Sequence, residues 1–281
     1  MKIAFIITHH PPTRPSPIIP EAILLLSEWG VNVDVICPEE QMTDLSKVQV
    51  EHDLYVLKSG TELALSMAGI LHVGGATILN PYPVAEMLRD KIMTSHILQA
   101  AGVPTPDAFV TADPKQLIPL LDDGPIVVKP YRGSQGRGVR VVRTADELNE
   151  TTSEDGFLFA QRYYEPQGLD KKIYVIGDQV YGVKRVWPPR TYEEKLGEPF
   201  TISPDLHEIA IKCGRAFGIG LYGFDVIENN GRSYVVDMSS FPGFKGVPNA
   251  ALRLADYIYS AGERVLSGTP LFPTLRKDAL V

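Results

Sequence analysis

The stretch that most constrains the fold of this chain runs from Pro125 to Val142 and reads PIVVKPYRGSQGRGVRVV. Valine and isoleucine on both sides favour β-strands, and the closely spaced glycines favour a turn, so the stretch predicts two strands joined by a hairpin. Glycines also let backbone N–H groups converge on an anion, and a lysine at the end of the first strand adds positive charge. Two interpretations follow, a flap over phosphate or an ordinary hairpin. The residues concerned are Lys129, Gly133, Ser134, Gln135, Gly136 and Gly138.

Two common phosphate-binding motifs do not fit this stretch. A Walker loop requires Gly-Lys-Ser or Gly-Lys-Thr after the glycines, and neither follows here. The dinucleotide-binding fingerprint requires another glycine spacing and a helix after the turn, whereas strand-forming residues follow. The choice between flap and hairpin therefore depends on the rest of the chain.

The overall composition excludes several classes of protein. The chain has 281 residues, enough for one large or two modest domains, and its net charge of −7 argues against nucleic acid as a partner. No apolar run approaches the ~20 residues that span a bilayer, and the opening MKIAFIIT has no signal-peptide cleavage pattern. Cys37 and Cys213, far apart in sequence, indicate reduced thiols. We expect a cytoplasmic protein without a membrane or nucleic-acid partner, and a homo-oligomer is compatible with the sequence.

The first 82 residues alternate short apolar strands with helices. Strands are expected at 2–8, 31–37, 53–57 and 76–79, with helices at 20–29 and 61–73. This order predicts a small parallel α/β layer, whose ligand would lie beyond the carboxyl ends of the strands. His9, Arg14 and Lys58 follow such ends and are candidate substrate residues, although a loop role without ligand remains open for the histidine.

The second part of the chain predicts an α+β fold. One helix is expected at 83–101, followed by a boundary at GVPTP (102–106), and another helix at 113–121. Gly177-Asp178 and Asn229-Asn230-Gly231 are strong turn signals between strand-forming runs, so each predicts a hairpin. The segment 187–201, with the Pro188-Pro189 pair and five charged residues, is expected to be an irregular loop.

The last expected hairpin carries two acidic residues in apolar strands. Asp225 lies in GFDVI, Asp237 lies in YVVDM, and Ser239 follows two residues later on the same face. Carboxylates in apolar strands are unfavourable unless they are paired or bound to metal, and Mg²⁺ takes few carboxylates together with water and phosphate oxygens. The pattern predicts a Mg²⁺ site, and carboxylates bonded to backbone N–H groups are the alternative.

Five collinear segments resemble the ATP-grasp superfamily, most closely the RimK-type carboxylate–amine ligases with a glutathione synthetase-like ATP-binding fold. They are RDK at 89–91, VVKP at 127–130 with GSQGRGV after it, QRYY at 161–164 with GLDKKIYVIGDQVYGVKR at 168–185, GFDVI at 223–227, and VVDMSSFPGFKGV at 235–247. Asp237 comes 12 positions after Asp225 and Ser239 comes two positions after Asp237, which is the spacing of the family's metal-binding set.

The resemblance implies a role for each matched residue. Lys91 and Lys129 would contact the ATP phosphates and the adenine side of the cleft, and residues 133–138 would cover the triphosphate. Lys172 and Arg185 would be catalytic, the arginine neutralising the transferred phosphoryl group, while Asp225, Asp237 and Ser239 would hold Mg²⁺. The residues near adenine and ribose would be Gln161, Arg162, Tyr163, Tyr164 and Asp170.

The sequence departs from the family pattern at several points. Asp237 stands where the family usually has Glu, Ser239 where it has Asn, and Arg162 where the hinge has Glu. The Arg-x-Asn motif expected after Arg185, where acceptor and product bind, is also absent. The nucleotide site therefore looks familiar, whereas the acceptor site does not.

These departures leave two alternatives to the ligase. FPGFKGV at 241–247 is similar to a segment of the ATP-grasp inositol polyphosphate kinases, which also place a lysine where Lys58 stands. A non-catalytic nucleotide-binding member is the other alternative. Arg14, Lys58, Arg190 and Lys245 would suit a polyanionic acceptor or an amino-acid carboxylate.

The favoured expectation is an ATP- and Mg²⁺-dependent ligase that joins a carboxylate to the amine of an amino acid or peptide through an acyl phosphate. Its α/β layer would occupy 1–82 and its ATP-grasp body 83–270, with two lobes at about 104–160 and 161–270 clamping ATP and a tail at 271–281.

Overall fold

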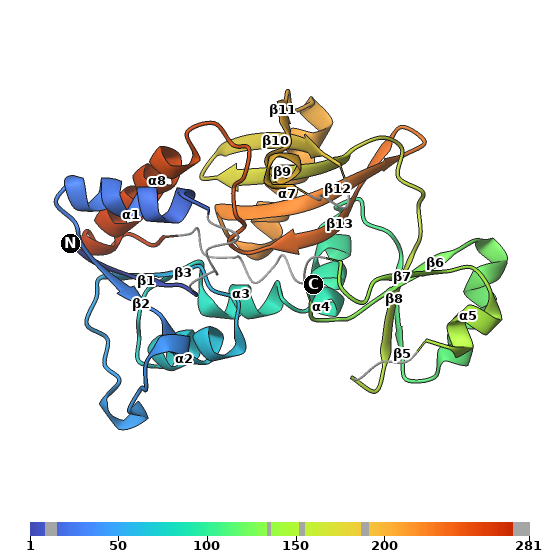
Figure 1. The fold of residues 1–281 in the computed structure, drawn as a ribbon, viewed down its shortest axis with the longest axis horizontal. Coiled ribbons are helices and arrows are strands. Elements are labelled where there is room, and N and C mark those ends of the chain that lie inside the picture. The colour runs from blue at the N-terminus through green and yellow to red at the C-terminus, as the bar shows by residue number, and fades with distance from the viewer. Residues whose placement is uncertain (9–15, 134–135, 152–154, 187–190, 272–281) are drawn as a thin grey trace.

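The computed structural model describes residues 1–8, 16–133, 136–151, 155–186 and 191–271. Three sheets follow one another along the chain, one parallel and two antiparallel (Figure 1). Among the described residues, no helix has both the length and the apolar character needed to cross a membrane.

The first sheet is parallel and has the strand order β2-β1-β3-β4. Its strands are β1 (Lys2–Ile6), β2 (Asn32–Ile36), β3 (Leu54–Leu57) and β4 (Ile78–Leu79), with helices α1 (Ile18–Glu28) and α2 (Glu62–Val73) and short 3-10 helices at Pro38–Glu40 and Leu45–Lys47. Successive residues of β1 and β3 point to opposite faces, so one face packs on α1 and the other on α2. The expected α/β layer is confirmed.

Two helices connect this layer to the second sheet. They are α3 (Tyr82–Met87) and α4 (Lys91–Ala100), where the sequence predicted one helix over 83–101. The break has a clear cause, because the Asp90 carboxylate accepts hydrogen bonds from the backbone N–H groups of Ile92 (2.8 Å) and Met93 (3.0 Å) and so begins a new helix.

The second sheet is antiparallel and has the order β5-β8-β6-β7. Its strands are β5 (Ala108–Thr111), β6 (Ile126–Lys129), β7 (Arg140–Val142) and β8 (Leu158–Arg162), and α5 (Ala145–Asn149) follows β7. The predicted hairpin is confirmed by the pairing of β6 with β7. The helix expected at 113–121 is a 3-10 helix, Pro114–Asp123, with Pro119 inside it. Strand β8 lies wholly in this sheet, and the predicted lobe limits of 104–160 and 161–270 remain predictions.

The third sheet is also antiparallel, with the order β11-β10-β9-β12-β13. Its strands are β9 (Asp170–Ile176), β10 (Gln179–Arg185), β11 (Glu198–Phe200), β12 (Leu221–Asn229) and β13 (Arg232–Ser239), so both predicted hairpins are confirmed. The segment expected to be an irregular loop contains α6 (Tyr192–Leu196) and β11, because Thr191 and Glu194 form a reciprocal capping box; residues 187–190 lie outside the described residues.

Helix α7 (Pro204–Phe217) covers one face of the third sheet. Ser203 caps its first turn, Pro204 occupies its first position, and Gly218 ends it in the left-handed conformation (φ 64°). Leu206, Ile209 and the residues that follow at helical spacing bury one stripe against β9, β12 and β13. This helix gives the metal-motif strands a rigid support.

The first layer and the third sheet share one hydrophobic core. Helix α8 (Ala250–Leu266) returns from the third sheet to lie beside α1 (Figure 1), and Trp29 meets Tyr259 edge-on with ring centroids 5.9 Å apart. The same cluster joins Phe5 of β1 to Tyr174 of β9 and Leu254 of α8. The N-terminal layer is therefore packed into the body. The domain limits at 82/83 and 270/271 remain predictions.

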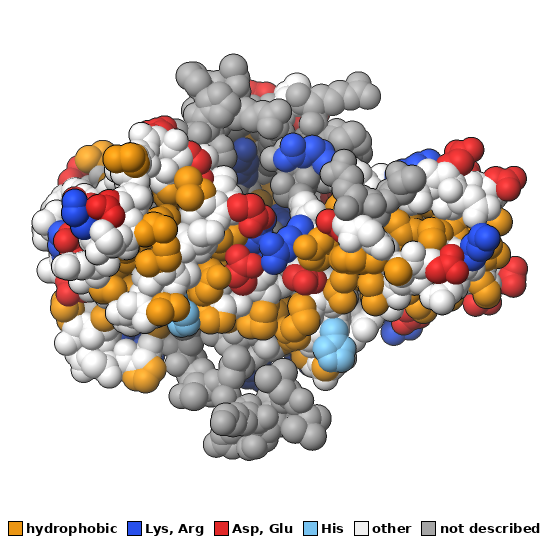
Figure 2. Space-filling model, turned by 90° about the horizontal axis from the view of Figure 1, so that it is seen from below, with side chains coloured by type: hydrophobic (Ala, Val, Ile, Leu, Met, Phe, Trp, Pro, Cys, Tyr) orange, Lys and Arg blue, Asp and Glu red, His pale blue; other side chains and the backbone are white. Residues whose placement is uncertain are grey.

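Ion pairs fasten the base of the glycine-rich hairpin to the N-terminal layer. The Arg132 guanidinium lies 3.3 Å from the Glu86 carboxylate of α3 and 3.7 Å from the Glu62 carboxylate of α2. Figure 2 shows acidic and basic side chains interleaved near the middle of the face seen from below, between hydrophobic patches.

Candidate active site

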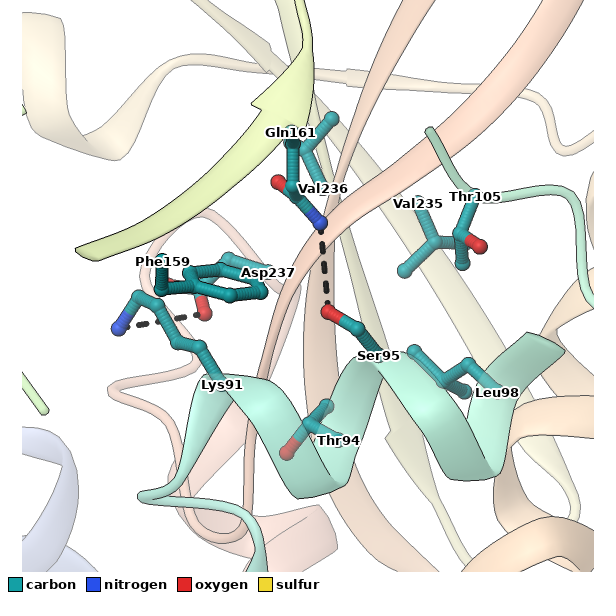
Figure 3. A pocket seen from close by; sticks show the side chains of 10 residues that line it. All are labelled: Lys91, Thr94, Ser95, Leu98, Thr105, Phe159, Gln161, Val235, Val236 and Asp237. Carbon is teal, nitrogen blue, oxygen red and sulfur yellow. Dashed lines mark hydrogen bonds and ion pairs between the residues drawn. The ribbon is translucent and has the colours of Figure 1, made fainter. Parts of the chain in front are cut away.

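A recess lies between the second sheet and strand β13, with α4 along one side (Figure 3). Strand pairing explains why its residues meet. Lys129 pairs with Phe159 and Val127 pairs with Gln161, so side chains two residues apart on β6 and β8 share the face toward β13. The lining residues are Lys91, Thr94, Ser95, Leu98, Thr105, Phe159, Gln161, Val235, Val236 and Asp237.

Lys129 holds the two sheets together across this recess. Its ammonium group donates hydrogen bonds to Oε1 of Gln161 (2.7 Å) and to the Val236 carbonyl of β13 (3.3 Å). The pKa of Lys129 is lowered from 10.5 to about 8, mainly by burial. The Asp237 charge opposes this shift, and the nearby Lys91 charge adds to it. A buried ammonium of this kind is a ready partner for an anion.

Lys91 links the glycine-rich turn to the acidic strand. Its Nζ donates to the Gly133 carbonyl (2.8 Å) and lies 3.8 Å from the Asp237 carboxylate, the ion pair drawn in Figure 3. Its backbone N–H donates to the Tyr131 carbonyl at 2.9 Å, which fixes the start of α4 against the turn. The lysine predicted from RDK therefore lies between the turn and the predicted metal site.

The glycine-rich turn needs glycine at defined positions. Gly133, Gly136 and Gly138 all have positive φ, which disfavours residues with a Cβ. At Gly138 (φ 73°) an added Cβ would also lie only 2.7 Å from Cγ of Pro130. Ser134 and Gln135, both predicted to contact ATP, lie outside the described residues.

The two predicted metal carboxylates face each other on paired strands. Asp225 of β12 is the register partner of Asp237 on β13, and Ser239 pairs with Gly223. A β-bulge follows Asp225, leaving Val236 as the extra residue of β13 and its carbonyl free for Lys129. Burial raises the pKa of Asp237, and the nearby Asp225 charge adds to this, while Lys91 acts against it.

Two cations bind the Asp225 carboxylate. Lys172 Nζ lies 2.9 Å from one oxygen and an Arg185 nitrogen lies 3.1 Å from the other. Strand register again explains the arrangement, because Asp225 pairs with Lys172 on β9, and Arg185 on β10 pairs with Asp170. Burial also raises the pKa of Asp170, with Asp225 adding to the effect. The predicted catalytic residues thus adjoin the predicted metal residues.

The side chains of the residues predicted at the adenine hinge point to different partners. The Gln161 side chain is buried and spans from Lys129 to the Ser95 hydroxyl (3.3 Å). The Arg162 guanidinium turns to the carbonyls of Leu120 (2.7 Å) and Gly124 (3.2 Å), so its side chain braces the 3-10 helix rather than the recess. The predicted place of Arg162 in the hinge beside adenine stays a prediction.

The hinge tyrosines lie at the edge between the sheets. Tyr164 stacks on Tyr234 of β13 with ring centroids 4.4 Å apart, and the Arg143 guanidinium lies 5.9 Å from the Tyr163 ring centroid. Their contact with a nucleotide stays a prediction.

Residues 88–258, more than half of the chain, match the family model of the RimK-like ATP-grasp domain. The chain belongs to the RimK-like ATP-grasp family. It is 27% identical over 210 residues to the alpha-aminoadipate–LysW ligase LysX of Saccharolobus solfataricus, an alignment covering 69% of this chain and 76% of that protein. It is 26% identical over 214 residues to the ribosomal protein bS6–L-glutamate ligase of Escherichia coli, covering 69% and 71%.

Solved structures agree with this assignment. The RimK domain ATP-grasp protein from Sphaerobacter thermophilus superposes with a TM-score of 0.71 at 18% identity, over 92% of this chain and 100% of that one. Family and fold confirm the predicted ATP-grasp body and the predicted class of enzyme, an ATP-using carboxylate–amine ligase.

The RimK-like site has a donor set that fits Mg²⁺. Asp225 and Asp237 supply carboxylates from paired positions and Ser239 supplies a hydroxyl on the same face. Mg²⁺ is commonly bound through one or two carboxylates plus phosphates and water, so two acidic residues suffice. Among the described residues, no group of three or more His, Cys, Asp or Glu side chains gathers as a metal site.

The predicted substrate residues are only partly brought together. Lys58, at the end of β3, lies close enough to Lys245 for its pKa to respond: burial lowers the pKa of Lys58 from 10.5 to about 8, and the Lys245 charge adds to this. His9, Arg14 and Arg190 lie outside the described residues. Lys58 follows β3 and Lys245 lies between β13 and α8, so their proximity could not be read from their separation in the chain.

The sequence reasoning missed one polar residue, Asn80, which lies between the N-terminal layer and the third sheet. Asn80 follows β4, is fully buried, and donates hydrogen bonds to backbone carbonyls of the third sheet. The Asn-Pro pair at 80–81 indicated only a strand end, because a buried long-range contact leaves no periodic signal in the sequence.

Proposed function

We propose that this RimK-like protein is an ATP- and Mg²⁺-dependent ligase that joins a carboxylate to an amine through an acyl phosphate. The observation that carries this proposal is the pair Asp225 and Asp237, with Lys172 and Arg185 on one carboxylate and Lys91 beside the other. The lysines and the arginine would bind the phosphates of Mg²⁺–ATP, and the two carboxylates would bind its metal ion. Without the nucleotide, these cations and carboxylates neutralise each other.

The chain's own residues would act by binding and charge neutralisation. Lys91 and Lys129 would bind ATP phosphates from the two sides of the recess, which they already line or bridge. Arg185 and Lys172, once released from Asp225, would face the negative charge that develops during phosphoryl transfer. Such preorganised charges in a partly desolvated site are the main source of catalysis in this chemistry.

Asp225, Asp237 and Ser239 would hold the metal. When bound there, Mg²⁺ supplies positive charge to the phosphate oxygens and orients the terminal phosphoryl group. In the reaction, a carboxylate oxygen bonds to the γ-phosphorus as the bond to the β-phosphate oxygen breaks, giving ADP and an acyl phosphate. The amine then attacks the acyl carbon, an amide bond forms, and inorganic phosphate leaves.

Lys58 and Lys245 support an acidic substrate. Two neighbouring ammonium groups at the junction between the N-terminal layer and the third sheet favour a molecule with an additional carboxylate. The names of the relatives agree, because LysX is an aminoadipate ligase and the bS6 enzyme is a glutamate ligase. We therefore propose an acidic amino acid or an acidic peptide end as one substrate.

The kinase alternative loses its specific support. It relied on FPGFKGV and Lys58, and Lys58 donates a hydrogen bond to the Phe241 carbonyl of that segment, so the two features form one structural contact. The two relatives named above, LysX and the bS6 enzyme, are ligases rather than kinases. We also propose a cytoplasmic location, because ATP is the co-substrate and both cysteines, Cys37 and Cys213, are buried thiols.

Phosphorus NMR of the protein with Mg²⁺–ATP and pools of amino acids or acidic peptides tests the proposal. ADP and free phosphate appearing only with a carboxylate and an amine are expected, and hydroxylamine in place of the amine should trap a hydroxamate. Asp225→Asn should abolish this turnover. New phosphate-ester signals without free phosphate, obtained with inositol phosphates, would instead show a kinase.

A further inference from the structure

Asn80 joins the N-terminal layer to the strands that carry the metal motif. Its side chain is fully buried, and Nδ2 lies 2.5 Å from the Leu221 carbonyl, 2.5 Å from the Ser240 carbonyl and 3.1 Å from the Ser240 hydroxyl. Carbonyl oxygens only accept hydrogen bonds, so the amide nitrogen of Asn80 must face them. One side chain therefore contacts two strands of another sheet.

The two acceptors lie at the same end of the β12–β13 pair. Leu221 is the first residue of β12, and Ser240 directly follows β13. The strands run antiparallel, with Gly223 opposite Ser239, so the start of one strand adjoins the end of the other. The Asn80 amide thus closes the strand pair beyond its last paired residues.

This closure matters because the strand pair has a bulge. From the Asn229 hairpin the ladder is regular as far as Val226 opposite Val235, and it then skips Val236 before Asp225 meets Asp237. A bulge interrupts the ladder, so pairing on one side fixes the alignment on the other side less strictly. Strand β12 also pairs with β9 from Leu221 to Val226, whereas β13 is the edge strand of the sheet. The segment that carries Asp237 therefore gains a further anchor from the Asn80 contact at its far end.

A second side chain of the N-terminal layer contacts the next residue. Lys58 Nζ donates to the Phe241 carbonyl at 3.1 Å and lies 5.3 Å from the Phe241 ring centroid. Asn80 and Lys58 come from the ends of β4 and β3, which are neighbours in the first sheet. Ser240 and Phe241, the two residues that follow Ser239, therefore accept hydrogen bonds from residues at the ends of the neighbouring strands β4 and β3.

The identity of residue 80 is consistent with a need for donors. Oδ1 of Asn80 is buried and has no hydrogen-bond partner among the described residues, which is unfavourable for a polar atom. Aspartate would place an anion against two carbonyl oxygens, and leucine would leave both carbonyls without a donor. The amide nitrogen of Asn80 therefore supplies the donor that both carbonyls use.

We propose that Asn80, assisted by Lys58, is a positioning residue that fixes the alignment of β12 with β13 and so the spacing between Asp225 and Asp237. The inference rests on the proposed function, because that function gives these two carboxylates the role of holding Mg²⁺. Asn80 itself touches neither substrate nor metal and acts through the strand ends.

Calorimetric titration of ADP, with Mg²⁺ varied and with EDTA, tests the inference without knowledge of the substrate. In Asn80→Ala the Mg²⁺-dependent gain in ADP affinity should fall about tenfold or more, while affinity in EDTA stays within about twofold of the wild type. Ser59→Ala is the matched control, because Ser59 is also buried at the end of β3 but bonds only within its own layer among the described residues. This control should keep the full Mg²⁺ effect.

Further variants make each outcome decisive. Asn80→Ser retains one donor and should give an intermediate loss, and it replaces Asn80→Ala if that variant does not fold. Lys58→Met should shift the Mg²⁺ dependence in the same direction by a smaller factor. An Asn80 variant that keeps the wild-type Mg²⁺ effect, or that weakens ADP equally with and without Mg²⁺, overturns the positioning role. Asp225→Asn distinguishes failure of the positioning role from failure of the proposed metal site. An unchanged Mg²⁺ effect in that variant overturns the metal site itself.

Discussion

Replacement of Lys58 by methionine should stabilise the protein at neutral pH and remove part of its pH dependence. Burial, with Lys245 nearby, lowers the pKa of Lys58 from 10.5 to about 8. Below pH 8 the Lys58 amine of the folded protein is protonated, and burial of its charge lowers the free energy of unfolding. Between pH 8 and 10.5 the folded state has released a proton that the unfolded state still binds, so the free energy of unfolding rises with pH.

The size of the effect follows from this pKa. A fall from 10.5 to about 8 corresponds to about 3 kcal/mol, at about 1.4 kcal/mol per pKa unit. Because Lys58 is only partly buried by surface area, solvent screening reduces this to about 1.5–2 kcal/mol. Loss of the hydrogen bond to Phe241 offsets about 1 kcal/mol. The variant should therefore be more stable by about 0.5–1 kcal/mol at pH 7 and less stable by about 1 kcal/mol near pH 10.

Urea denaturation at pH 7, 8.5 and 10, followed by the fluorescence of Trp29 in a Trp187→Phe background, measures this difference. Trp29 packs edge-on against Tyr259 of α8, so its emission reports on the core shared by the N-terminal layer and the third sheet. Lys115→Met, at an exposed position, is the matched control and should change stability equally at all three pH values. A constant difference between wild type and Lys58→Met across this range would refute the reasoning.

Other predictions follow from single contacts. Lys129→Met should weaken ATP binding by more than the ~1 kcal/mol of an exposed charge pair, and wild-type affinity should fall as the pH rises through about 8, both measurable by calorimetry. Gly138→Ala should weaken ATP binding and lower the melting temperature, because the new Cβ meets Pro130; Gly156→Ala, with a similar φ (75°) and open space, should leave ATP affinity unchanged. Phe217→Ala should reduce the free energy of unfolding by about 3–5 kcal/mol in a denaturant titration, since the ring is 1% exposed under the third sheet. A loss below about 1 kcal/mol would contradict that packing.

Local patterns correctly predicted the strands that carry the candidate site. Glycine and β-branched residues predicted the hairpin of β6 and β7, and alternation along YVVDMSS placed Asp237 and Ser239 on one face. These inferences succeed because backbone preference and side-chain alternation depend on neighbouring residues alone.

The errors share a different origin. The break between α3 and α4 depends on one helix cap at Asp90. The helix in segment 191–200 depends on a capping box at Thr191. The Arg162 guanidinium donates hydrogen bonds to the carbonyls of Leu120 and Gly124, a contact that no local pattern records. Single hydrogen bonds outweighed the average preferences in each case.

The sequence by itself determined the family, the class of reaction and the donor types at the site, since each depends on residue identity and short spacing. Only the tertiary structure decided which charges meet. It paired Asp225 with Lys172 and Arg185 through strand register, brought Lys58 to Lys245, and aimed the Asn80 amide at Leu221 and Ser240. Those contacts join residues far apart in the chain, so their geometry exists only once the three sheets have packed together.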